Sequence, residues 1–146
     1  AISTILFGFI LWGANYFSKA HSEKKLVSVR DAFLIGLAQC FALIPGASRS
    51  AVTIICALFL SYSRSVSSKF AFMLAIPTLG VIFISELASI SFSSFEEGWL
   101  NIFLITFFSF ITSYACISLF LKFIERVGFM PFVLYRVILG SFLLLF

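Results

Sequence analysis

Charged residues are scarce in this chain. Asp, Glu, Lys and Arg make up 11% of its 146 residues, against about 25% in a typical soluble domain. There is one histidine, and the three cysteines lie within apolar runs. So little charge excludes an intrinsically disordered chain. So few cysteines exclude a secreted disulfide scaffold.

Apolar side chains take the place of the missing charges. Hydrophobic residues account for 62% of the chain, and phenylalanine alone occurs 21 times. A soluble domain of this size cannot hide that much apolar surface, so the composition predicts an all-α integral membrane protein. The net charge of +4 does not indicate nucleic-acid binding, because the basic residues lie between apolar runs and form no continuous stripe.

Four apolar segments predict membrane-spanning helices, at about 1–17, 70–90, 99–121 and 129–146. A spanning helix needs about 20 apolar residues, and together these segments predict a multi-span helical bundle. We expect a single membrane domain over the whole chain. The chain opens with alanine inside an apolar run, so we expect it to begin partway through a larger protein.

Two further apolar stretches, at about 31–44 and 48–60, are too short to span a membrane. As helices they would be arms of roughly 21 Å each, and a Pro-Gly turn separates them. Matched short arms predict a re-entrant helix–turn–helix, which enters and leaves the membrane by the same face. Such a turn is tolerated where protein or a water-filled cavity surrounds it.

The loop charges predict an orientation. The loops at 18–31, 61–69 and 122–128 are net basic, whereas the loop at 91–98 holds two glutamates and no base. With a re-entrant pair the three basic loops fall on one side of the membrane, which the positive-inside rule assigns to the cytoplasm. The tip of the re-entrant pair then faces the outer side.

The turn between the short arms carries the chemistry. It reads Pro45-Gly46-Ala47-Ser48-Arg49-Ser50, and Ser48 is the expected N-cap of the outgoing arm. A helix N-terminus with a guanidinium and hydroxyls is suited to bind phosphate at membrane depth. We therefore predict catalytic roles for Arg49, Ser48 and Ser50, and substrate binding by Gly46, Ala47 and Thr53.

Two polar residues outside the turn are further candidates. Gln39 is predicted either to donate to the phosphate or to bridge helices, and Arg136 either to contact the phosphate or to support the turn. An arginine at membrane depth could instead serve an anion transporter or channel with a re-entrant loop. The sequence predicts no metal-binding residue, and it leaves the nucleophile and the general base open.

Several segments resemble one known family. Residues 44–53 (IPGASRSAVT) look like the PGxSRSxxT signature of bacterial undecaprenyl-diphosphate phosphatases, the bacitracin-resistance type. Gln39 stands where that family has a glutamine. Ser63-Arg64 with FAFMLAIP at 70–77, and GFMPF at 128–132 with Tyr135-Arg136, are similar to two more of its segments. The resemblance covers almost the whole chain and corresponds to the C-terminal half of the family.

The resemblance implies a function. The chain would be one half of an inverted-repeat architecture in a multi-pass protein of the bacterial inner membrane. That protein would hydrolyse undecaprenyl diphosphate to the monophosphate, recycling the carrier lipid for peptidoglycan synthesis and giving bacitracin resistance. The expected partners are the lipid diphosphate, membrane lipid and the missing N-terminal half, with a homodimer as a further candidate assembly. That half would supply acidic and histidine motifs, including the ligands of a divalent cation, Mg²⁺ or Ca²⁺.

Overall fold

The computed structural model describes residues 2–21, 27–89 and 99–145. Each element in these ranges is a helix, in the order α1 (Ile2–His21), α2 (Val29–Ala38), η1 (Gln39–Leu43), α3 (Arg49–Phe59), α4 (Arg64–Ser89), α5 (Trp99–Val127) and α6 (Met130–Leu145).

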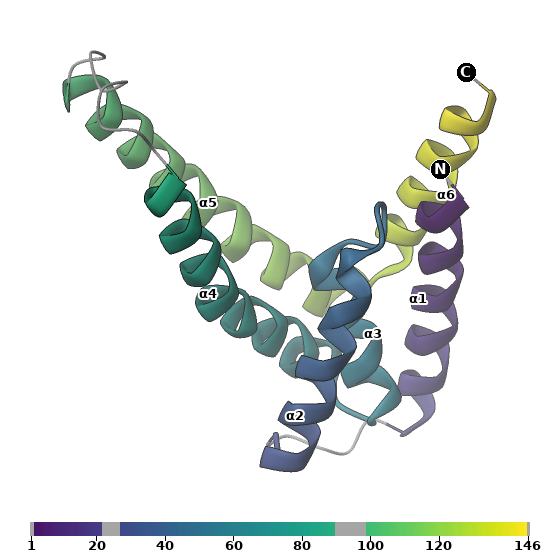
Figure 1. Ribbon diagram of the computed structural model, residues 1–146. Helices are drawn as coiled ribbons and strands as arrows, with labels where there is room; N and C mark the ends of the chain where they lie inside the picture. The colour runs from purple at the N-terminus through teal and green to yellow at the C-terminus, as the bar shows by residue number, and fades with distance from the viewer. Residues whose placement is uncertain (1, 22–26, 90–98, 146) are drawn as a thin grey trace.

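The helices form two diverging arms (Figure 1). One arm pairs α4 with α5, and the other pairs α1 with α6. The hairpin of α2, η1 and α3 lies where the arms meet, and its connecting turn points into the space between them. The end of α1 and the segment before α4 lie at the opposite end of the hairpin from the turn.

The prediction of an all-α membrane protein is confirmed. Among the described helices, α4 and α5 are each long and apolar enough to cross a membrane. The apolar helices α1 and α6 are shorter. The helical hairpin predicted from the two short arms is present, whereas its entry and exit by one membrane face stays a prediction.

The helices extend beyond several of the apolar segments. α4 begins at Arg64 and α5 continues to Val127, so part of each predicted basic loop is helical. Backbone hydrogen bonding does not stop where apolar sequence stops, because a helix can continue past the hydrocarbon core into water. The incoming arm differs in another way: its α-helix ends at Ala38, and the rest, Gln39–Leu43, is a 3₁₀ helix.

The short helix α3 lies at the centre of the packing. Seven of its eleven residues are buried, and it packs against α1, α2, η1 and α4. Its Ile54 and Leu58 join a core cluster with Leu11, Ile124 and Phe129, which come from other helices and the α5–α6 connection. An eleven-residue helix is roughly 16 Å long. It is too short to cross a hydrocarbon core of about 30 Å, so the surrounding helices must satisfy its polar ends.

Tyr62 fixes the end of the hairpin that lies away from the turn. Its side chain is buried, and its hydroxyl donates to Asp31 Oδ2 at 2.6 Å. The Tyr62 hydroxyl oxygen also accepts from the backbone N–H of Ser28 at 3.3 Å, and Ser28 caps α2 by accepting from the Asp31 N–H. Ser18 at the end of α1 donates to the Tyr62 carbonyl at 3.2 Å. Through its side chain and its backbone carbonyl, Tyr62 thus joins α1, α2 and the segment after α3.

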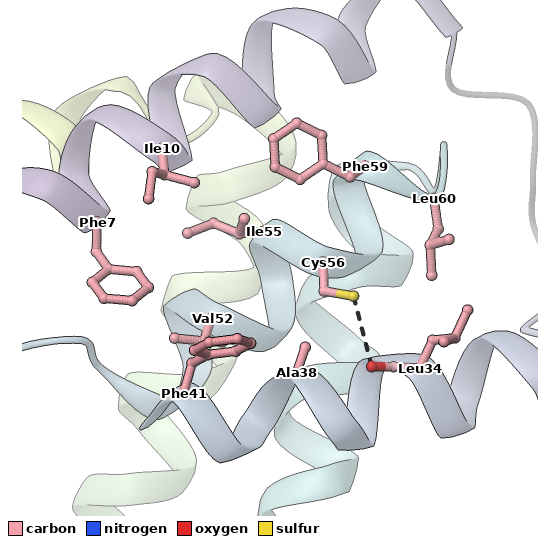
Figure 2. A pocket seen from close by; sticks show the side chains of 10 residues that line it. All are labelled: Phe7, Ile10, Leu34, Ala38, Phe41, Val52, Ile55, Cys56, Phe59 and Leu60. Atoms are coloured by element: carbon pink, nitrogen blue, oxygen red, sulfur yellow. Dashed lines mark hydrogen bonds between the residues drawn. The ribbon is translucent and has the colours of Figure 1, made fainter. Parts of the chain in front are cut away.

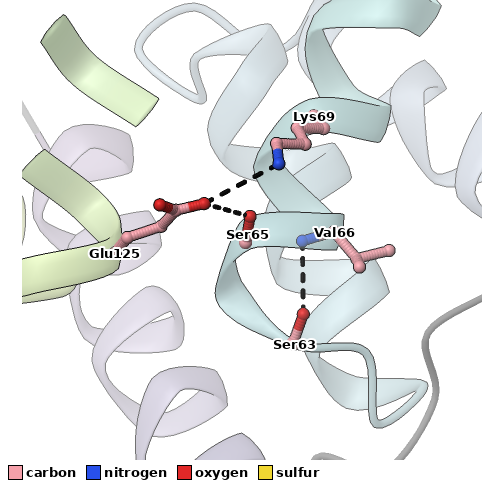
Figure 3. Close-up of polar contacts among 5 residues, drawn as sticks. All are labelled: Ser63, Ser65, Val66, Lys69 and Glu125. Atoms are coloured by element: carbon pink, nitrogen blue, oxygen red, sulfur yellow. Dashed lines mark hydrogen bonds and ion pairs between the residues drawn. The ribbon is translucent and has the colours of Figure 1, made fainter. Parts of the chain in front are cut away.

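Polar contacts also join the first turns of α4 to the end of α5 (Figure 3). Ser65 donates to Glu125 Oε1 at 2.6 Å, and Lys69 Nζ lies 3.7 Å from the same oxygen. Arg64 lies against Gly128, since a Cβ at that glycine would be 2.7 Å from Arg64 Nη1. The two basic segments 61–69 and 122–128 therefore lie together.

Candidate functional site

The tip of the hairpin is a tight turn over residues 44–47. The Ala47 N–H donates to the Ile44 carbonyl at 3.1 Å, and Gly46 has a φ of +88°. Proline followed by glycine at positive φ is the pattern of a type II turn. The turn touches α1 closely, because a Cβ at Gly46 would lie 2.8 Å from Thr4 Oγ1.

The turn delivers the chain directly into the first turn of α3. Ser48 occupies the N-cap position, as predicted, but its side chain makes no capping hydrogen bond. Its backbone has a φ of +57°, which points the hydroxyl away from the first amides; the oxygen lies 3.4 Å from Ser50 Oγ instead. The positive end of α3 is thus left without a side-chain cap, as an anion site requires.

Arg49 lines a cavity of about 520 Å³ with Ser50, between the start of α3 and the arm of α4 and α5. The other walls are apolar and come mainly from α4, at Phe72, Ala75, Ile76 and Leu79. Within the described part of the chain, Arg49 has no ion-pair partner. A half-buried guanidinium without a carboxylate is available for an anionic ligand.

Arg136 lines a second cavity, of about 260 Å³, together with Ser48 and Ser50. Its Nη2 donates to the Gly46 carbonyl at 3.4 Å. Its Nη1 is buried and has no hydrogen-bond partner among the described residues. A buried N–H group of a cation is costly to leave without an acceptor. The side chain thus supports the turn and still has a donor to offer.

Ser50 lies on both cavities, with Arg49 on one and Arg136 on the other. The structure therefore groups four predicted site residues around the start of α3: Ser48, Arg49, Ser50 and Arg136. An anion with several oxygens could receive hydrogen bonds from the hydroxyls, the guanidinium groups and the first-turn amides at once. Such donors stabilise phosphoryl oxygens in phosphoryl transfer.

Three other residues that were predicted to bind the substrate do not belong to this group. Ala47 is fully buried. The Thr53 hydroxyl is also buried and donates back to the carbonyls of Arg49 and Ser50 at 3.2 and 3.0 Å. Of the two roles predicted for Gln39, the structure has the helix bridge, because its Nε2 donates to Thr78 Oγ1 at 2.9 Å.

The described residues do not fit a divalent cation. Within these ranges no three His, Cys, Asp or Glu side chains lie close enough together to hold a metal ion. Around the start of α3 the polar groups are guanidinium N–H, hydroxyl and amide N–H donors, whereas Mg²⁺ and Ca²⁺ require oxygen ligands and favour carboxylates. The expected cation would depend on ligands from elsewhere.

A third cavity, of about 530 Å³, lies on another face of α3 (Figure 2). It is walled by α1, α2, η1 and α3, and its lining is apolar apart from Cys56, whose Sγ lies 3.9 Å from the Leu34 carbonyl. Phe7 and Phe41 approach it from α1 and η1. Its lining holds no charged side chain, in contrast to the cavities lined by Arg49 and Arg136.

Two threonines next to the site were missed by sequence reasoning. Thr4 packs on the turn at Gly46, and Thr78 is the partner of Gln39. Each lies in a long apolar segment, where isolated polar residues commonly join helices in membranes. That rule could have singled out both threonines, but not their partners, which lie more than 35 positions away in the sequence.

Comparison with known proteins decides the family. Residues 1–142 match the family described as bacitracin resistance protein BacA. The chain belongs to this family. Over 146 residues it is 40% identical to an undecaprenyl-diphosphatase of Chromohalobacter salexigens and 42% identical to one of Campylobacter concisus, covering 99% of this chain in both cases. It spans about half of these relatives, 54% of each.

Proposed function

We propose that this chain forms the phosphate-binding part of an undecaprenyl-diphosphatase. The protein would hydrolyse undecaprenyl diphosphate to undecaprenyl phosphate and inorganic phosphate, and so recycle the carrier lipid for peptidoglycan synthesis and give bacitracin resistance. The observation that carries this proposal is the grouping of Arg49 and Arg136 on either side of Ser50, at the uncapped start of α3. The names of the relatives favour this function over anion transport.

The arrangement suggests how a diphosphate would bind. Its two phosphates would lie across Ser48 and Ser50, with one guanidinium serving each cavity. Guanidinium groups can hold phosphate oxygens through two parallel hydrogen bonds. In hydrolysis, water adds to the terminal phosphorus while the bridging P–O bond breaks, and the negative charge on the phosphoryl oxygens is held by these donors. The apolar cavity walls would contact the first isoprene units.

The general base would come from outside this chain. The described residues at the site supply hydrogen-bond donors, and a serine hydroxyl such as that of Ser48 or Ser50 needs a base to act as a nucleophile. We propose that the chain works with the additional length that its relatives have, which would also provide the ligands of a divalent cation. Purified alone, the 146-residue chain is then expected to release no phosphate.

Arg49→Lys tests the proposal in the complete protein. Lysine keeps the charge but loses the planar pair of donors, so phosphate release from undecaprenyl diphosphate should fall about a hundredfold, which is typical of removing one transition-state donor. Arg126→Lys, at the exposed end of α5, is the matched control and should retain activity. Full turnover by Arg49→Lys, or anion flux in liposomes without phosphate release, would contradict the proposal.

We further propose that the site opens to the outer side of the bacterial inner membrane. Support comes from the basic segments 61–69 and 122–128, which lie together, with the start of α4 at the end of the hairpin opposite the turn (Figure 1). In a cysteine-free background, Pro45→Cys at the exposed turn should react with a membrane-impermeant thiol reagent added outside spheroplasts. Lys69→Cys should react only in inverted vesicles. The reverse pattern would overturn this orientation.

A further inference from the structure

One side-chain hydrogen bond ties the hairpin to α4. Gln39 Nε2 donates to Thr78 Oγ1 at 2.9 Å, and the Thr78 hydroxyl donates in turn to the Leu74 carbonyl at 3.0 Å. The two residues are 39 positions apart, and the bond is partly buried. In an apolar environment such a bond has few competitors, because water is scarce and an unpaired amide is costly.

The bond connects two weak points in the backbone. Gln39 is the first residue of η1, where the incoming arm changes from α-helix to 3₁₀ helix. Thr78 follows Pro77, which lies inside α4 and removes one backbone hydrogen bond from that helix. Local changes of helix type and proline positions are where helices bend most easily. The bridge therefore restrains two segments that could otherwise shift.

Both segments border the Arg49 side of the site. Ala75, Ile76 and Leu79, on either side of Thr78, wall the cavity that Arg49 lines. In the incoming arm of the hairpin, η1 runs from Gln39 to Leu43 and leads directly into the turn before Ser48. A shift of α4 relative to η1 would therefore change the width of the Arg49 cavity and the position of the start of α3.

We infer that Gln39 and Thr78 act as one positioning pair, which sets the distance between the phosphate-binding turn and the α4 wall of the Arg49 cavity. Neither residue touches the substrate in this role. This inference rests on the proposed function. It makes Gln39 a positioning residue, and it adds Thr78, which was not among the predicted site residues.

A double-mutant cycle on phosphate release by the complete protein tests the pair. Gln39→Leu and Thr78→Val should each lower kcat about tenfold, since small displacements at a reacting centre are costly, with KM changed by less than about twofold. The double variant should be no worse than either single variant, because both remove the same bond. Thr78→Ser restores the hydroxyl and should restore kcat.

Controls separate positioning from folding. Thr106 on α5 makes the same kind of bond to its own helix, Oγ1 to the Ile102 carbonyl at 2.8 Å, and has no inter-helix bond among the described residues, so Thr106→Val should leave kcat unchanged. The melting temperature in detergent is measured for every variant. Gln39→Met keeps an unbranched side chain of similar length and removes the amide, so it should match Gln39→Leu in kcat if the fold is intact.

If the wild-type protein releases phosphate, any one of three results would overturn the inference. The first is Thr78→Val with normal kcat beside an impaired Gln39→Leu, as a glutamine that binds phosphate directly would give. The second is a double variant whose loss is the product of the single losses. The third is a Thr78→Ser variant as impaired as Thr78→Val. A wild-type protein that releases no phosphate would instead refute the proposed function, and the positioning role with it.

Discussion

The helices α3 and α5 are both rich in apolar residues, yet they lie in opposite surroundings. In α3 seven of eleven residues are buried. Among the described side chains of the 29-residue helix α5, only Ile124 is buried. Phe103, Phe107, Phe110 and Tyr114 are exposed on α5, and among the described residues their ring contacts are with neighbours on the same helix. Apolar sequence alone therefore does not decide whether a helix faces protein.

The lengths of the two helices and the residues at their ends explain the difference. α5 is roughly 44 Å long, so it can cross a bilayer and place both ends in or near water while its sides face lipid. α3 is too short for that, and it starts at a polar turn. Its end groups must be satisfied inside the protein, which draws α1, α2, η1 and α4 around it. Paired substitutions in the hairpin and in the long arm test this contrast.

The largest effect is expected at the glycine of the turn. Gly46→Ala forces a side chain into a backbone with φ of +88° and places its Cβ 2.8 Å from Thr4 Oγ1. We expect a loss of about 3 kcal/mol in the free energy of unfolding in detergent, from backbone strain together with overpacking. Gly80→Ala is the counterpart in α4, where nothing lies within 4 Å. It should be neutral or slightly stabilising, and equal losses at both positions would contradict the contrast.

A leucine in each region gives the next effect. Leu58 in α3 is 1% exposed, whereas Leu119 in α5 is 67% exposed. Leu58→Ala should cost about 2 kcal/mol of unfolding free energy, the low end for soluble cores, because lipid already solvates apolar groups and only packing is lost. Leu119→Ala should cost less than about 0.5 kcal/mol. Chemical unfolding of both variants in mixed micelles measures the difference.

Two tyrosines provide a smaller, polar comparison. Tyr62→Phe removes the hydroxyl that donates to Asp31 and accepts from the Ser28 N–H. We expect a loss of about 1.5 kcal/mol, since one partner is a carboxylate. Tyr114→Phe on the exposed face of α5 should leave the melting temperature unchanged. If the Tyr62→Phe and Tyr114→Phe variants have the same melting temperature, the Tyr62 hydroxyl contacts do not stabilise the hairpin.

The smallest effect is expected at the Lys69–Glu125 pair, which links α4 to α5 at 3.7 Å with both side chains at least half exposed. Exposed ion pairs contribute little, because water and salt screen them. Lys69→Ala should leave the melting temperature within experimental error at both low and high salt. A clear decrease, present only at low salt, would show that this end of the arm depends on the pair.

Much of the candidate site could be predicted from local sequence. The Pro-Gly pair predicts a turn with a positive φ at Gly46, and the order Ser48, Arg49, Ser50 predicts a helix start with a guanidinium in its first turn. These features depend on steric preferences within a few residues. The Ser48 capping bond was expected on the same grounds, but the backbone of Ser48, at φ of +57°, turns its hydroxyl toward Ser50.

The sequence alone was enough to predict an all-α membrane protein and a Pro-Gly turn that leads into a helix start with Ser48, Arg49 and Ser50, because composition and helix-breaking residues act locally. The sequence could not predict that Arg136 reaches the Gly46 carbonyl, 90 positions away, that Ser50 lies between two cavities, or that Gln39 bonds to Thr78. Helix packing brings these residues together from separate apolar segments. Apolar segments of similar composition carry little information about their neighbours, since lipid and protein solvate them almost equally well.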